Sequence, residues 1–162
     1  HLGMDEETAR HQTDFDYALM RQHDLWWHDL YFLVKQTEKA GCRAWVWSDY
    51  VWEHGDIFWK KMPRDVMQSN WYYGHSFSLK LRYIRAYLEL EKHGYDQIPT
   101  GSNWTVPTNL IRTVQFCRRN IAAKRLKGFL QTPWRPTLPV YREQHLAAID
   151  QVAHAVRWIT NR

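Results

Sequence analysis

Apolar residues in this chain alternate between long segments with helical spacing and short, nearly continuous runs. Apolar positions three and four residues apart predict amphipathic helices, and short apolar runs bounded by turn residues predict strands. The predicted helices cover about residues 14–39, 56–61, 76–94, 108–121 and 139–162. The predicted strands cover about residues 43–47, 65–70, 97–100 and 127–132.

Residues that favour helix ends flank these segments. The candidate N-terminal residues are Ser76 or Ser78, Thr108 and Pro139, and the candidate stops are Gly41 and Gly94. The last helix is expected to bury Leu146, Ile149, Val152, Val156 and Ile159, which share one face at helical spacing.

Strands that alternate with longer helices predict parallel βα units and not a helical bundle. Four such units are visible, so the expected fold class is α/β. The tripeptide Ser-Asn-Trp occurs just beyond two predicted strands, at 69–71 and at 102–104. Because barrel enzymes place their active sites at the C-terminal ends of strands, these positions favour a functional site. The alternative is that the indoles only cover the end of the sheet.

Composition narrows the function classes. The chain has 162 residues with ten Trp and nine Tyr, enough aromatic surface to fill a core, line a cleft, or both. The net charge of +5 comes from scattered Lys and Arg that form no basic stripe, which argues against nucleic-acid binding. Cys42 and Cys117 are expected to be small core residues. No apolar run approaches the roughly 20 residues that span a bilayer.

Histidine spacing argues against a metal enzyme, although the chain has nine His. His23 and His28 are five residues apart, so they do not present two imidazoles on one helical face as zinc-binding pairs do. We therefore expect no metal and no cofactor. His1 is expected to support the acidic loop that follows it.

The opening segment, residues 1–6 (His-Leu-Gly-Met-Asp-Glu), places two adjacent acids on a glycine-containing loop. Asp5 and Glu6 point in different directions in a loop, so they can take different roles. Glycoside hydrolysis needs a protonated carboxyl group, and an apolar pocket lined by indoles favours that form. Glu6 is the candidate acid. Alternatively, these acids and Glu7 interact with the dipole of a following helix.

This segment resembles the His-x-Gly-Gly-Asp-Glu signature of family 20 glycoside hydrolases, the β-N-acetylhexosaminidases. Residues 46–49 (Val-Trp-Ser-Asp) resemble the Trp-x-Glu segment that ends the fifth barrel strand of that family. The resemblance implies a (β/α)8 TIM-barrel fold in which the acidic loop follows strand 4 and residues 1–162 supply strands 5 to 8 with their helices.

The resemblance also implies a mechanism in which the substrate's 2-acetamido oxygen attacks the anomeric carbon. Asp5 would then orient the acetamido group, and Glu6 would protonate the leaving oxygen and later activate water. The implied substrate-binding residues are His1, Trp47, Asp49, Trp71, Tyr72 or Tyr73, Trp104 and Trp134. Trp134 would stack below the sugar ring, and one of the two tyrosines would donate a hydrogen bond to the acetamido oxygen.

Three positions depart from the family pattern. Met4 stands where the family has a second Gly, Asp49 replaces Glu, and Arg135-Pro136 follows Trp134 where the family places a sugar-binding Glu. These departures predict a divergent member with an unusual sugar preference or weakened activity.

A chain that supplies half of a barrel is expected to belong to a longer protein and to need a partner. A half-barrel leaves open strand edges and apolar helix faces, so we expect association with the N-terminal half or with a second copy. The resemblance also suggests an exported enzyme.

Two rival functions stay open. One is a noncatalytic carbohydrate-binding protein on the same scaffold, which would need the indoles but not the paired acids. The other is a glycosidase with an enzyme nucleophile, for which Asp49 or Glu53 would be the second carboxylate.

Overall fold

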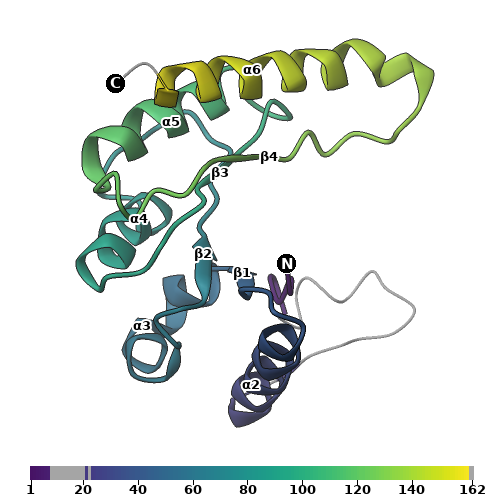
Figure 1. Ribbon diagram of the computed structural model, residues 1–162. Helices are drawn as coiled ribbons and strands as arrows, with labels where there is room; N and C mark the ends of the chain where they lie inside the picture. The colour runs from purple at the N-terminus through teal and green to yellow at the C-terminus, as the bar shows by residue number, and fades with distance from the viewer. Residues whose placement is uncertain (8–20, 22, 161–162) are drawn as a thin grey trace.

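The computed structural model describes residues 1–7, 21 and 23–160, and these form alternating helices and short strands (Figure 1). The helices are α2 (Asp24–Lys39), α3 (Tyr50–Lys61), α4 (Arg82–Lys92), α5 (Asn109–Asn120) and α6 (Arg142–Thr160), with the 3-10 turn η1 (Pro139–Tyr141) before α6. The strands are β1 (Trp45–Trp47), β2 (Met67–Ser69), β3 (Thr100–Gly101) and β4 (Leu130–Gln131). The predicted α/β class is confirmed.

The strands lie side by side in chain order and run parallel. Trp45 pairs with Met67 across β1 and β2, and Thr100 pairs with Leu130 across β3 and β4. Parallel bridges from Gln68 to Gln97 and from Trp71 to Thr100 connect the two pairs of strands. Each strand therefore reaches its neighbour through a helix, as the alternation of patterns predicted.

The N-terminal segment adds a further extended stretch beside β1. The backbone N–H of Leu2 donates to the carbonyl of Trp45 (2.7 Å), and the N–H of Trp47 donates to the carbonyl of Gly3 (3.2 Å). Within the described residues, no pairing joins this segment to β4 at the other end of the order. The described part is therefore an open parallel array.

The core lies between the strands and the helices. Val46 points away from the face that carries Trp45 and Trp47 and is buried against Trp26, Leu30 and Phe58. A second cluster contains Ile84, Tyr87, Cys117 and Ile121, and a third contains Leu110, Val114 and Ala155. α3 packs on α4, and α5 packs on both α6 and β3.

Three helix starts differ from the sequence prediction. α2 begins at Asp24, so residues 21 and 23 of the predicted 14–39 are not helical. α3 begins at Tyr50, earlier than the predicted 56–61, and has non-helical dihedral angles at His54 (φ −126°, ψ 35°). α4 begins after Leu81, so neither Ser76 nor Ser78 caps it. Their hydroxyls instead accept the backbone N–H groups of Ser78 and Lys80 in the preceding turn. Short polar side chains stabilise turns as readily as helix ends, which explains this difference.

The predicted helix ends at Gly41 and Gly94 and the predicted start of the last helix at Pro139 are confirmed. Gly41 and Gly94 follow α2 and α4 with φ values of 69° and 83°, a conformation that glycine adopts without a steric penalty. Pro139 opens the turn that leads into α6. Residues 14–20 and 22 of the predicted first helix lie outside the described residues.

The predicted buried face of α6 is right at Val152, which packs against the core, and wrong at Leu146 and Ile149. Ile149 is 63% exposed and Leu146 is 38% exposed, whereas Ala148 and Ala155 are buried. Ala148, Val152 and Ala155 are four and three residues apart, and their small side chains let α6 pack closely on α5. The side chains of Val156 and Ile159 lie outside the described set.

The two cysteines differ. Cys117 is buried as expected, but Cys42 is exposed, so its assignment to the core is wrong. Cys42 follows the helix stop Gly41, where the chain turns over the surface before β1.

Among the described residues, every helix is too short or too polar to cross a bilayer.

Candidate functional site

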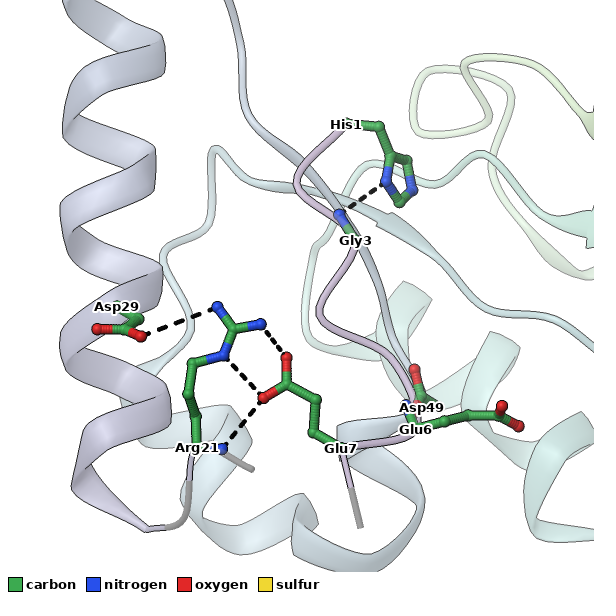
Figure 2. A network of polar contacts seen from close by, with 7 residues as sticks. All are labelled: His1, Gly3, Glu6, Glu7, Arg21, Asp29 and Asp49. Carbon is green, nitrogen blue, oxygen red and sulfur yellow. Dashed lines mark hydrogen bonds and ion pairs between the residues drawn. The ribbon is translucent and has the colours of Figure 1, made fainter. Parts of the chain in front are cut away.

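The acidic loop lies at the end of β1 and is fixed there by His1 and by backbone contacts. The N–H of Gly3 donates to Nδ1 of His1 (2.9 Å), as Figure 2 shows. The imidazole ring also packs against the indoles of Trp45 and Trp47, with both ring centroids at 4.7 Å. The predicted support role of His1 thus has a structural basis, and Trp47 serves as part of its packing surface.

The loop adopts an unusual backbone conformation. Gly3 has φ 72°, Met4 has φ 69° and Glu6 has φ 50°. Residues other than glycine rarely adopt positive φ, and they persist there only when surrounding contacts fix them. Met4 provides such a contact because its side chain is buried in the core with only 5% exposure. Strain of this kind is common where a loop must hold functional groups in place.

Glu6 and Glu7 point to opposite sides of the loop. Glu7 pairs with the guanidinium of Arg21, which also lies 3.9 Å from Asp29 of α2 (Figure 2). Glu6 points to the other side of the loop. Glu7 is therefore linked to α2 through Arg21, and both Glu6 and Glu7 line the cavity described below.

Asp49, directly after β1, lies behind this loop. Its Oδ2 accepts the backbone N–H of Glu6 at 2.9 Å, and its Oδ1 is buried without a hydrogen bond from any described residue. Burial raises the pKa of Asp49 from 3.8 to about 7. The hydrogen bond from Glu6 opposes this shift, and the charges of Asp5 and Glu6 add to it. Three carboxyl groups therefore meet at the end of β1.

A cavity of about 930 Å³ opens beside these acids. Of the predicted site residues, Glu6, Asp49, Trp71 and Tyr72 line it. Its volume lies near the top of the roughly 300–1,000 Å³ range of small-molecule sites. Its lining combines aromatic rings with eight acidic or basic side chains.

The aromatic wall of the cavity is held by an asparagine. Trp52 and Trp71 meet edge to face with ring centroids 4.6 Å apart, and Trp52 meets Tyr83 in the same way at 4.6 Å. Asn70 Oδ1 accepts the Nε1–H of Trp52 (2.8 Å), and its Nδ2 donates to the Tyr83 carbonyl (2.7 Å). The amide thus holds the Trp52 ring and the Tyr83 backbone in position.

Tyr73 connects this wall to the later strands. Its ring stacks on Trp71 at 5.2 Å, and its hydroxyl accepts a hydrogen bond from Thr132 just after β4 (3.0 Å). Burial raises the pKa of Tyr73, hydrogen bonds from Thr132 and Trp134 oppose the shift, and the charges of Asp5 and Glu6 add to it. Tyr73 is therefore a protonated donor within the electrostatic reach of the acidic loop.

Trp104 and Trp134 lie outside the lining of the cavity. They are 44% and 54% exposed, and Trp134 has φ 50°. Their loops meet, because Arg135 donates to the Trp104 carbonyl at 3.3 Å. Thr105 also donates to the Tyr73 carbonyl at 2.8 Å. The predicted site residues thus form two connected groups, one around Glu6 and one around Tyr73.

The repeated Ser-Asn-Trp tripeptide has equivalent contacts in both copies. Ser69 and Ser102 each donate through Oγ to a carbonyl on the next strand, Ile98 (2.6 Å) and Thr132 (2.5 Å). Asn70 and Asn103 each donate through Nδ2 to a backbone carbonyl in the first turn of a helix. The repeat therefore builds the same strand ending twice, and each copy places a tryptophan just beyond it.

Sequence reasoning missed Trp52, Arg82 and Tyr83. These residues belong to the first turns of α3 and α4 and not to strand ends, so the search for strand-end aromatics passed over them. The available signal was the position of Trp52, five residues after the end of the predicted strand 43–47.

Neither a metal site nor a comparison with known proteins assigns a function to this cavity. Within residues 1–7, 21 and 23–160, no group of three or more His, Cys, Asp or Glu is placed to hold a metal ion. The fold and site thus describe an α/β protein with an acidic, aromatic cavity at its strand ends. No protein-family model, curated protein or solved structure matches the chain.

Proposed function

We propose that this protein is a glycoside hydrolase that removes β-linked N-acetylhexosamine by substrate-assisted, retaining catalysis. The observation that carries the proposal is the placement of Glu6 on a strained loop at the end of parallel strands, lining a large cavity with Trp71 and Tyr72. A carboxyl group beside aromatic walls is the arrangement that glycosidic bond cleavage needs.

The proposed roles follow the loop geometry. Glu6 faces the cavity and acts as the acid and then the base, while Asp5 orients the acetamido group. Tyr72, which lines the cavity, or Tyr73, which stacks on Trp71, donates to the acetamido oxygen. Trp71 provides the wall beside the sugar, Trp47 and His1 support the loop, and Trp104 and Trp134 serve the outer side of the substrate.

The conformation of Met4 supports the resemblance to family 20. That family has glycine at this position, and Met4 has φ 69°, which glycine adopts readily. The departure in sequence therefore keeps the family's backbone requirement, and burial of the methionine side chain offsets the strain. The loop can present Asp5 and Glu6 without the second glycine.

The surroundings of Asp49 favour substrate assistance over an enzyme nucleophile. Its Oδ2 accepts the Glu6 N–H, and its Oδ1 is shut off from solvent. Glu53 pairs with Arg82. A carboxylate nucleophile must reach the anomeric carbon, and these contacts direct both acids to other partners. A noncatalytic sugar-binding protein stays the second candidate, supported by the aromatic wall alone.

The proposal predicts hydrolysis of an aryl β-N-acetylglucosaminide without hydrolysis of the matching β-glucoside. Only the first substrate carries the acetamido oxygen that acts as the nucleophile. Release of the aryl alcohol, followed by absorbance, measures both rates on the same preparation. Equal cleavage of both substrates would favour an enzyme nucleophile, and sugar binding without cleavage of either would favour the noncatalytic alternative.

We also infer that further βα units cover the two ends of the described array. Leu25 and Phe32 of α2 are 63% and 58% exposed at one end, and Val140 and Ile149 are 74% and 63% exposed at the other. Both ends lie beside a strand with one described neighbour. Large exposed apolar residues at both open edges are what a part of a closed barrel presents.

This inference predicts that residues 1–162 alone self-associate. The same exposed surfaces would then pair between copies, so light scattering after size-exclusion chromatography should give a mass well above 19.7 kDa. Leu25→Glu with Phe32→Glu should lower that mass. A folded monomer of 19.7 kDa for the unchanged sequence would contradict the inference.

A further inference from the structure

The side chain of Asp49 contacts the acidic loop and not its own helix. Asp49 is the N-cap of α3, directly beyond β1, and an aspartate at this position commonly accepts a backbone N–H of the helix that follows. Its carboxyl group makes no such bond. It accepts the backbone N–H of Glu6 at 2.9 Å, across 43 positions of the chain. Figure 2 shows the two residues side by side.

We propose that Asp49 is a positioning residue, which holds the Glu6 carboxyl group in the direction from which it protonates the leaving oxygen. The inference rests on the proposed function, because it takes Glu6 as the acid. In this role Asp49 contacts no reacting atom and acts only through the backbone of Glu6. The role differs from the substrate contact that the family resemblance implies for Asp49.

The backbone of Glu6 needs such a contact. Its φ of 50° is an angle that residues other than glycine rarely adopt, and it persists only where surrounding groups fix it. A change to negative φ would turn the side chain and move the carboxyl group. A displacement of about 1 Å in a catalytic group can cost about 10²-fold in rate.

The other contacts of the loop lie on either side of Glu6. Before it, the Gly3 carbonyl accepts the first bond from the end of β1. After it, Glu7 pairs with Arg21. These contacts fix where the loop passes β1 and where it approaches α2. The bond to Asp49 fixes the residue between them.

Asp49 is itself held firmly. The N–H of Trp52 donates to its carbonyl at 3.0 Å, in the first turn of α3. Its Oδ1 is buried, so water does not compete at this carboxyl group, and a hydrogen bond is stronger in such surroundings. Burial also raises the pKa of Asp49 to about 7. Its neutral form, present below that pH, does not repel the charges of Asp5 and Glu6.

The test is a double-mutant cycle on hydrolysis of the β-linked disaccharide N,N′-diacetylchitobiose. Asp49→Ala removes the acceptor and should lower kcat about 10²-fold in wild type, because the acid is displaced. In Glu6→Gln, which has no acid to position, the same replacement should change kcat by about twofold or less. Equal losses in both backgrounds would overturn the proposal, since Asp49 would then act on a group other than Glu6.

Two further variants separate positioning from general damage to the fold. Asp49→Asn keeps an oxygen that accepts the Glu6 N–H, so it should retain most of the wild-type kcat. Ser48→Ala removes a neighbouring buried hydroxyl that donates to Gln68 (3.1 Å), and it should leave kcat unchanged. A loss in Asp49→Asn as large as that in Asp49→Ala would overturn the role of the acceptor.

Hydrogen exchange separates failure of this inference from failure of the proposed function. Measured by NMR, the Glu6 amide proton should exchange about tenfold faster in Asp49→Ala than in wild type or Asp49→Asn. If wild type hydrolyses no glycoside yet this pattern holds, the hydrolase proposal fails and the positioning of Glu6 by Asp49 stands. Equal exchange in Asp49→Ala and wild type would overturn the positioning role whatever the activity.

Discussion

Replacing Glu6 with Gln should lower kcat for N,N′-diacetylchitobiose by about 10²- to 10⁴-fold, the usual contribution of a general acid. Gln matches Glu in size and keeps the backbone N–H that Asp49 accepts, so the loop should stay in place. The amide cannot donate the proton that the leaving oxygen needs. Steady-state kinetics on wild type and variant measure the loss.

A comparison of two leaving groups tests whether Glu6 acts as a proton donor. A dinitrophenyl leaving group departs without protonation, so the same variant should lose much less activity on a dinitrophenyl β-N-acetylglucosaminide. Glu38→Gln, an exposed substitution on α2, should change neither rate. Equal losses on both substrates would assign Glu6 to binding or to loop structure in place of proton transfer.

Replacing Asp49 with Asn should stabilise the folded chain at high pH and have little effect near pH 4. The folded-state pKa of Asp49 is raised from 3.8 to about 7, so between these values the folded chain holds a proton that the unfolded chain releases. Stability therefore falls as pH rises across this window and levels off above it. Three pKa units correspond to about 4 kcal/mol of unfolding free energy.

The Asp49→Asn variant should not lose folding stability across this pH window, because its side-chain amide carries no charge and still accepts the N–H of Glu6. The free-energy difference between variant and wild type should therefore grow by up to about 4 kcal/mol from pH 4 to pH 8. Urea unfolding at pH 4, 6 and 8 measures it, with Asp56→Asn on the exposed side of α3 as the control. A difference that stays constant with pH would show that Asp49 ionises normally.

Some elements followed directly from local sequence. The stops at Gly41 and Gly94 and the opening of the last helix at Pro139 agree with the structure. These features depend on backbone preferences within a few residues, which act the same way in any fold.

Other elements depended on distant contacts and could not be predicted. The buried face of α6 is set by how closely α5 approaches, so Ala148 is buried and the larger Ile149 is exposed. Ser78 was a reasonable cap, but the position of α4 over its strand moved the helix start to Arg82. The spacing of apolar residues along a helix does not specify which neighbouring element its apolar face will pack against.

The candidate site also has one part that the sequence predicted and one part that it did not. The sequence pointed to Glu6, Trp71 and Tyr72, which line one cavity, because acids on a glycine loop and aromatics after strands are visible in one dimension. The wall of Trp52 and Tyr83 was not visible, since these residues are 31 positions apart and meet only when α3 and α4 pack across β1 and β2.

The sequence by itself determined that this is an α/β chain with parallel strands and an acidic, aromatic set of strand ends, because alternation and turn chemistry act locally. Only the tertiary structure decided that Asp49 is buried behind Glu6, that Met4 takes a left-handed conformation, and that two helices add a second wall to the cavity. Burial, electrostatic coupling and cavity shape arise from residues far apart in the chain, and the fold alone brings them together.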